Sequence, residues 1–353
     1  MPIQQGLIDV HHHLIPPVFR QAMARKGIHL VAGAPLPSWS PEKSIKQMNA
    51  NGIQTAILSL SAPGTDFGDG AQAAANLARA CNEYSADIIS RFTGRFGSFA
   101  VLPTNFPELA CREAEYALDT LRLEGVVMLG STQGLFLGDP ALDELMALLN
   151  ERRAVVFVHP NLHATSVDHG LSIPGFLMEF LCDTTRAALN LIHHDVLNRY
   201  PNIRWILAHS GGFLPAMAWR GETLRSFAAQ GTNVLSEASK FYYDTALSPS
   251  HYSSQVLSHL VPASQILFGS DFPFAPAPIT PLQINTLKDS GVFSDDARYA
   301  LQRKNALGLF PQYTQALEVP TAKVIRNEAS WQETLGAKLA SFSGRFVERI
   351  RAR

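Results

Sequence analysis

Cysteine is scarce in this chain, with three residues among 353. Cys81, Cys111 and Cys182 stand far apart, so we expect neither a disulfide framework nor a thiolate zinc site, and a reducing, cytoplasmic compartment is the simpler expectation. The sequence also lacks an uninterrupted apolar run of about 18 residues and a charged segment followed by an apolar one. We therefore expect neither a membrane-spanning helix nor a secretory signal.

An excess of charge of either sign is also absent. The 29 basic and 30 acidic side chains give a formal net charge of −1 at pH 7. A balanced chain gives no indication of a surface that binds polyanions. We expect neither nucleic acid nor a membrane as a partner.

The chain does contain a regular alternation of apolar runs of strand length with segments of helical period. The runs are Leu7–Val10 and residues 53–60, 97–102, 125–129, 154–158, 203–208, 241–245 and 265–269. Continuous apolar runs that alternate with helices are typical of parallel strands covered by helices. Eight such units in residues 1–312 predict an α/β fold, a (β/α)8 TIM barrel. An open doubly wound sheet is the alternative, but it more often has a Gly-rich phosphate turn after the first strand, and none is present.

The first connection of this barrel is predicted to be an extended loop. Residues 14–40 contain four prolines and two glycines. A loop of this length inside a compact domain is usually functional. We expect it to end at Ser40, which can cap a helix whose first residue is Pro41.

The last part of the chain, residues 313–353, departs from the repeat and is predicted to be a helical extension. From Trp331 to Ile350 the apolar residues recur every three or four positions with basic residues between them, as in an amphipathic helix. Such a helix packs on the barrel or on a second copy of the chain. We expect a homodimer, although this apolar stripe can also be covered within one chain.

Histidines and one aspartate follow the predicted strands. His11 and His13 come after the first strand, and because residues two apart in a strand project the same way, both imidazoles can reach one ion. A tag remnant would not sit directly behind a hydrophobic strand. His159, His209 and Asp271 follow the fifth, sixth and eighth strands. The C-terminal strand ends of a TIM barrel converge on one site, so we expect these side chains to lie together.

The residue types at these positions indicate a catalytic metal site. One histidine at a strand end is as often a satisfied core residue, but four with an aspartate on the same face are hard to explain that way. Imidazole nitrogens with one carboxylate suit Zn²⁺ first, and Mn²⁺ or Fe²⁺ next. Because the set has no thiolate, an open catalytic site is favoured over a closed structural one.

The same positions carry a resemblance to a known family. Asp9-x-His11-x-His13, His159-Pro160, residues 208–212 and residues 269–273 resemble the motifs of the amidohydrolase superfamily, in its branch of single-metal decarboxylases. That branch includes aminocarboxymuconate-semialdehyde, γ-resorcylate and 6-methylsalicylate decarboxylases. The resemblance extends from Ile8 to about Phe310. Within the branch, residues 183–190 are most similar to the 6-methylsalicylate group.

The resemblance implies roles for these residues. His11, His13, His159 and Asp271 would hold one divalent metal ion, Zn²⁺ first and Mn²⁺ second, and His209 would be an acid or base beside it. The fourth strand ends without a lysine that would bridge a second metal.

The resemblance implies a narrower range of substrates than that of the whole superfamily. Phe213 follows Gly212 where the γ-resorcylate type has a glutamate nearby, and this disfavours 2,6-dihydroxybenzoate. Trp39, Asn161 and Phe274 are predicted to contact the substrate; for the two aromatic rings, packing in the core is an equal alternative.

The function expected from these features is a metal-dependent, non-oxidative decarboxylase of a small aromatic carboxylic acid of the salicylate type, with 6-methylsalicylate as first choice. Asp271 is the first candidate to protonate the ring carbon before CO₂ leaves. In the alternative, His209 activates a metal-bound hydroxide that adds to the substrate. A metal-dependent hydrolase of a lactone or amide is the alternative on the same fold. A barrel that binds metal without catalysis is a third.

Overall fold

The computed structural model describes residues 6–163, 166, 173–224 and 233–315. The predicted extension, residues 313–353, therefore lies outside the described residues except for its first three. None of the helices in the described ranges has the length and apolarity needed to cross a membrane.

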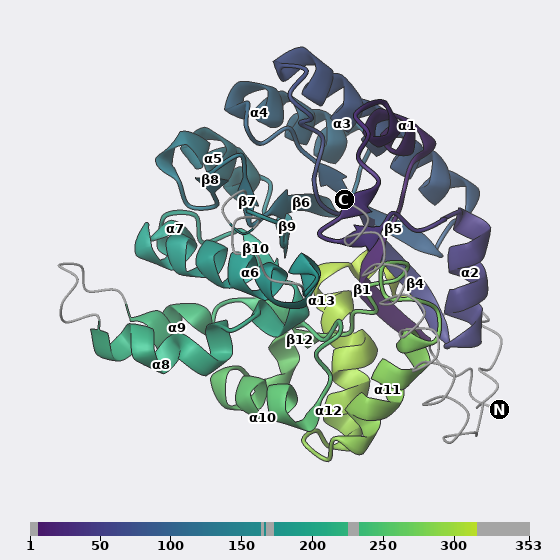
Figure 1. Ribbon diagram of the computed structural model, residues 1–353. Coiled ribbons are helices and arrows are strands. Elements are labelled where there is room, and N and C mark those ends of the chain that lie inside the picture. Colours follow the sequence, from purple (N-terminus) through teal and green to yellow (C-terminus); the bar gives the residue numbers. More distant parts are fainter. Residues whose placement is uncertain (1–5, 164–165, 167–172, 225–232, 316–353) are drawn as a thin grey trace.

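Eight parallel strands form one sheet whose spatial order follows the sequence. They are β1 (Leu7–His13), β4 (Ile53–Ser59), β5 (Phe96–Val101), β6 (Gly125–Leu129), β9 (Val155–His159), β10 (Arg204–Leu207), β11 (Tyr242–Asp244) and β12 (Ile266–Leu267). Val10 N–H donates to Phe268 O at 2.9 Å and His13 N–H to Phe272 O at 2.7 Å, which joins the last strand to the first. The predicted TIM barrel is confirmed, and the ring of helices around it is visible in Figure 1.

The helices cover the outside of the barrel. They are α1 (Pro17–Arg25), α2 (Pro41–Ala50), α3 (Ala71–Arg91), α4 (Pro107–Glu115), α5 (Asp143–Glu151), α6 (Gly175–His193), α7 (Val196–Arg199), α8 (Leu214–Leu224), α9 (Val234–Ala238), α10 (His251–Leu260), α11 (Ile279–Asp289), α12 (Asp295–Tyr299) and α13 (Asn305–Leu309). Ser40 caps α2 as expected, because its hydroxyl accepts the N–H of Lys43.

The first connection is more regular than its prolines suggest. It contains helix α1 and a small antiparallel pair, β2 (Leu30–Val31) with β3 (Ala34–Pro35). Pro17 stands at the first helical position, where its missing N–H costs no hydrogen bond, and Phe19 and Met23 bury one face of the helix. A second small pair, β7 (Ser131–Thr132) with β8 (Leu135–Phe136), follows β6.

The barrel interior is filled by apolar side chains from alternate strand positions. Val10, Phe99, Val127, Phe157 and Ile206 are buried in one cluster that runs through the barrel. Phe99 and Phe157 stack at a centroid distance of 5.3 Å. This packed floor leaves the C-terminal strand ends as the place where polar side chains gather.

Candidate active site

Four predicted ligand residues meet at the C-terminal mouth of the barrel. One ligand atom from each of His11, His13, His159 and Asp271 lies within 4.8 Å of the others, and all four residues are buried. Nε2 of His13 lies 3.0 Å from Nε2 of His11 and 3.0 Å from Oδ1 of Asp271. This set, named the ligand cluster below, is able to hold a metal ion.

The imidazoles of His13 and His159 both direct Nδ1 at a backbone carbonyl oxygen. Nδ1 of His13 donates to Ser59 O at 3.1 Å and Nδ1 of His159 to Pro160 O at 2.8 Å. A carbonyl oxygen can only accept, so each Nδ1 carries the proton. The lone pair of each ring is then on Nε2, the nitrogen that is free for a cation. The donor set therefore fits a divalent metal.

The charges of His13, His159 and Asp271 also suit a metal, whereas an ion would have to displace a proton from His11. Burial lowers the pKa of His13, and it lowers that of His159 well below its usual value. Burial alone would raise the pKa of Asp271, but hydrogen bonds with His11 and His13 hold it well below its usual range. Neutral imidazoles and an ionised carboxylate are the forms that bind metals.

Asp271 reaches the cluster through an unusual backbone. Its φ is 59°, in the left-handed region, which costs free energy in a non-glycine residue. The N–H of Asp271 donates to His11 O at 2.8 Å, and Asp9 accepts the N–H of Ser270 at 3.0 Å and its hydroxyl at 2.5 Å. These bonds tie the segment after β12 to β1 and offset the strain, which gives Asp9 of the first motif its structural role.

His209 lies beside the cluster on a second strained turn. Its φ is 54°, and its ring centroid is 4.9 Å from that of His11. Gly212 belongs to the same turn, three residues further along the chain. A Cβ on Gly212 would lie 2.3 Å from Leu181 O, so the turn requires glycine there. Nδ1 of His209 donates to Ala246 O at 3.1 Å, and burial lowers the pKa of the ring. A neutral imidazole that can take a proton on Nε2 results.

One buried acidic residue at the mouth of the barrel was not predicted from the sequence. Asp244 ends β11, and its Oδ2 accepts Nδ1–H of His11 at 2.7 Å. Burial opposes a charge on His11, but Asp244 and Asp271 together raise its pKa to about 10. A signal was available, because Asp244 stands near the end of the seventh predicted strand, as the ligand residues stand at the ends of the first, fifth and eighth.

The three residues predicted to contact the substrate lie in different surroundings. Phe274 packs edge-on against His13 at a centroid distance of 5.2 Å. Asn161 braces its own loop, since its Nδ2 donates to Ser131 O and its Oδ1 accepts Leu162 N–H, both at 2.9 Å. The structure thus brings Phe274 against the ligand cluster.

Trp39 lies in the layer between barrel and helices. Its Nε1 donates to Ser44 Oγ of α2 at 2.8 Å, and its ring meets Tyr84 of α3 at 6.4 Å. These contacts account for Trp39 by packing. The roles of Trp39, Asn161 and Phe274 in substrate binding stay predictions.

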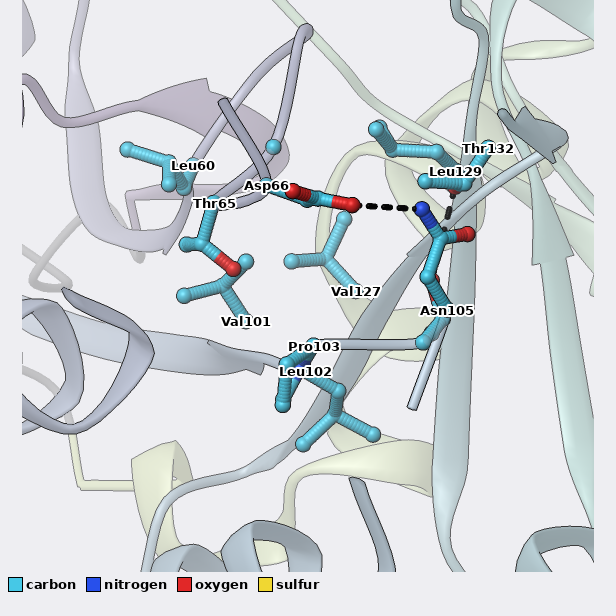
Figure 2. A pocket seen from close by; sticks show the side chains of 12 residues that line it. Leu60, Thr65, Asp66, Val101, Leu102, Pro103, Asn105, Val127, Leu129 and Thr132 are labelled. Carbon is cyan, nitrogen blue, oxygen red and sulfur yellow. Dashed lines mark hydrogen bonds between the residues drawn. The ribbon is translucent and has the colours of Figure 1, made fainter. Parts of the chain in front are cut away.

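A small cavity lies between the ends of β4, β5 and β6 (Figure 2). Its volume is about 10 Å³, the size of one water molecule. Its apolar wall is formed by Leu60, Val101, Leu102, Val127 and Leu129. Leu60 directly follows Ser59, which binds His13, and Leu129 pairs with His159 across the sheet, but none of the four cluster residues lines the cavity.

Two curated proteins named decarboxylases match most of this chain. The chain is 34% identical over 334 residues to Decarboxylase yanB of Aspergillus niger, which covers 90% of each protein. It is 33% identical to 6-methylsalicylic acid decarboxylase of Penicillium expansum, over 88% of this chain and 98% of that protein.

A solved structure shows the same fold. The dihydroxybenzoic acid decarboxylase of Polaromonas sp., with bound manganese and the inhibitor 2-nitroresorcinol, superimposes with a TM-score of 0.77 over 88% of this chain and 98% of that one, at 22% identity. The family described as Amidohydrolase matches residues 8–312, nearly the whole barrel. The chain therefore belongs to the amidohydrolase family.

Proposed function

We propose that this protein is a metal-dependent, non-oxidative decarboxylase of a small aromatic carboxylic acid of the salicylate type, with 6-methylsalicylate as the first candidate. One observation carries the proposal: three imidazoles and one carboxylate converge, buried, at the mouth of the barrel. Relatives named decarboxylases match nearly the full chain at 33 to 34% identity and supply the reaction class.

The proposed cofactor is one divalent ion held by His11, His13, His159 and Asp271. Three nitrogens and one oxygen suit Zn²⁺, our first choice, and Mn²⁺ is the second because the Polaromonas enzyme contains manganese. Such an ion supplies Lewis acidity and a fixed orientation for anionic oxygens.

The proposed substrate fits the surroundings of the cluster. Phe274 and Phe180 lie against His13 and His159, at centroid distances of 5.2 and 5.9 Å. Aromatic rings pack favourably against such side chains. An anionic, flat and mostly apolar molecule matches this combination of a cationic site with aromatic neighbours.

The proposed proton path uses Asp271 and His209. Asp271 is ionised, so it is able to take the phenolic proton of the substrate and pass it to the ring carbon that bears the carboxylate. The bond from that carbon to the carboxylate then breaks, CO₂ leaves, and the ring regains its aromaticity. His209 is the alternative acceptor, since its Nδ1 is held by Ala246 and its Nε2 is free to take a proton.

We also propose a homodimer in the cytoplasm. Leu177 of α6 and Trp219 of α8 are 59% and 69% exposed, and their helices are in contact. Large exposed apolar side chains are candidates for an interface between chains. Light scattering of the full chain, compared with Trp219→Glu, tests this proposal; a monomeric wild type contradicts it.

The experiment that tests the function is incubation of metal-analysed protein with salicylate, 6-methylsalicylate and 2,6-dihydroxybenzoate. CO₂ release and the phenol product are measured, with a chelated sample and Asp271→Asn as controls. We expect release from at least one acid, abolished by the chelator. No release from protein that carries about one metal per chain contradicts the proposal and favours hydrolysis, for which lactones and amides are the next substrates.

A further inference from the structure

The carboxylate of Asp244 has all its hydrogen-bond partners in and around the candidate active site. It is fully buried at the end of β11. Oδ2 accepts Nδ1–H of His11 at 2.7 Å, and Oδ1 accepts the backbone N–H groups of His209 and Ala246, both at 2.9 Å. A buried carboxylate is costly unless such bonds compensate it, so its place here calls for a role.

The His11 ring is held from two sides. Nδ1 points at Asp244, and Nε2 lies 3.0 Å from Nε2 of His13 and 3.4 Å from Oδ1 of Asp271. The carboxylate accepts the Nδ1 proton, which leaves the Nε2 lone pair for a cation. A carboxylate behind a metal-binding histidine fixes both its orientation and its tautomer.

His11 differs from its neighbours in this support. Nδ1 of His13, His159 and His209 each donates to a backbone carbonyl oxygen. Among these four rings, His11 is the one whose Nδ1 is held by a carboxylate; His13 Nδ1 also lies 3.1 Å from the hydroxyl of Ser59. Substitution of Asp244 therefore tests the support of His11 directly.

The second oxygen of Asp244 holds the turn that presents His209. That turn has a left-handed φ at His209, which the surrounding bonds must maintain. Oδ1 binds the N–H of His209 and the N–H of Ala246, and Ala246 O accepts Nδ1–H of His209. Asp244 thus fixes the backbone of His209 and, through Ala246, its ring.

We infer that Asp244 is a positioning residue that sets His11 for the metal with one carboxylate oxygen and sets His209 for proton transfer with the other. The part of this role that concerns His209, the catalytic half, rests on the proposed function. The part that concerns His11, the metal half, needs only the ligand cluster, so the two halves are tested by different measurements.

Asp244→Asn separates the two oxygens. The amide oxygen still accepts the N–H groups of His209 and Ala246, but the amide nitrogen now donates toward Nδ1 of His11. The His11 proton is then forced onto Nε2, toward the cluster, where it opposes a cation. Asp244→Ala removes both contacts.

The first measurement is the dissociation constant of metal-free protein for Zn²⁺ and for Mn²⁺, by competition with a chromophoric chelator. We expect Asp244→Asn and Asp244→Ala each to weaken binding about 10- to 100-fold. The control is Glu113→Gln, a buried carboxylate on the outer helix α4 that binds Asn82 and Arg79, and it should bind metal as the wild type does.

The second measurement is urea unfolding of the same metal-free proteins. A merely structural role predicts that metal affinity follows stability, with Asp244→Asn close to the wild type in both. Our proposal predicts that Asp244→Asn is close to the wild type in stability but close to Asp244→Ala in metal affinity. Wild-type metal affinity in a folded Asp244→Asn overturns the role at His11.

The third measurement is kcat at saturating metal with the best acid from the panel. Excess metal should restore most of the activity of Asp244→Asn, because His209 is still held. It should leave Asp244→Ala at least about 100-fold below the wild type, as expected when an acid or base is misplaced. Equal recovery of both variants overturns the role at His209. If no acid reacts with the wild type, the proposed function and this half fail together, while the metal half is decided by the first two measurements.

Discussion

His12 and Ser44 form a buried hydrogen bond on the outer side of the strand that carries His11 and His13. Nε2 of His12 lies 2.9 Å from Oγ of Ser44, and Nδ1 lies 3.0 Å from Oδ2 of Asp9. The indole of Trp39 can only donate, so it supplies a proton to Ser44 Oγ, and the hydroxyl proton goes to His12. His12, the middle histidine of the run, therefore supports the strand from its outer side.

Ser44→Ala should destabilise the protein without loss of metal. The substitution leaves the buried Nε2 of His12 and Nε1 of Trp39 without a partner, which costs about 1–3 kcal/mol. Urea unfolding measures this cost and metal analysis the stoichiometry. Ser90→Ala, at an exposed serine, is the control and should change stability by less than about 0.5 kcal/mol. A loss of metal from folded Ser44→Ala would contradict the separation of His12 from the ligand cluster.

His209→Asn should lower kcat and leave the metal in place. Removing an acid or base costs about 10²- to 10⁴-fold in rate. His209 lies outside the four-residue ligand cluster, so the metal content should stay near the wild-type value. Steady-state kinetics and metal analysis of one preparation provide the test. If the metal is lost together with the activity, His209 is a ligand instead of an acid or base.

Metal binding should increase the stability of the fold as well as permit catalysis. The ligands come from β1, β9 and the segment after β12, so an ion would connect distant parts of the chain. Free metal at 100 times its dissociation constant should add about 2.7 kcal/mol to the free energy of unfolding. Thermal unfolding with and without Zn²⁺ measures the shift. Asp271→Asn is the control, and an equal shift in this variant would place the ion elsewhere.

Alkaline pH should destabilise the protein through Tyr313. Burial and the neighbouring Glu124 raise the pKa of this phenol, whereas in the unfolded chain it ionises near pH 10. The contribution of the neutral Tyr313 phenol to stability is therefore complete below about pH 10 and is lost as the pH rises further. Each pH unit in that range should cost about 1.4 kcal/mol. Urea unfolding between pH 8 and 11 measures the slope, which should be smaller in Tyr313→Phe; identical slopes would contradict this origin.

The barrel itself was predictable because its signals are local. Each of the eight strands is a short apolar run, and burial by the helices requires that pattern wherever the strand stands in the sequence. The residues at the strand ends were predictable for a related reason. A parallel barrel brings all C-terminal ends to one mouth, so His159 and Asp271 could be assigned to the site of His11 without knowledge of distances.

Only the tertiary structure decided which nitrogen of each imidazole faces the cluster and what holds it there. The partner of His11 is Asp244, 233 residues away in the sequence, and no local pattern links the two. The same holds for Trp39, whose place beside Ser44 and Tyr84 depends on how α2 and α3 pack. Composition and period determine which side chains reach the mouth of this barrel; the packing of distant elements determines their orientation.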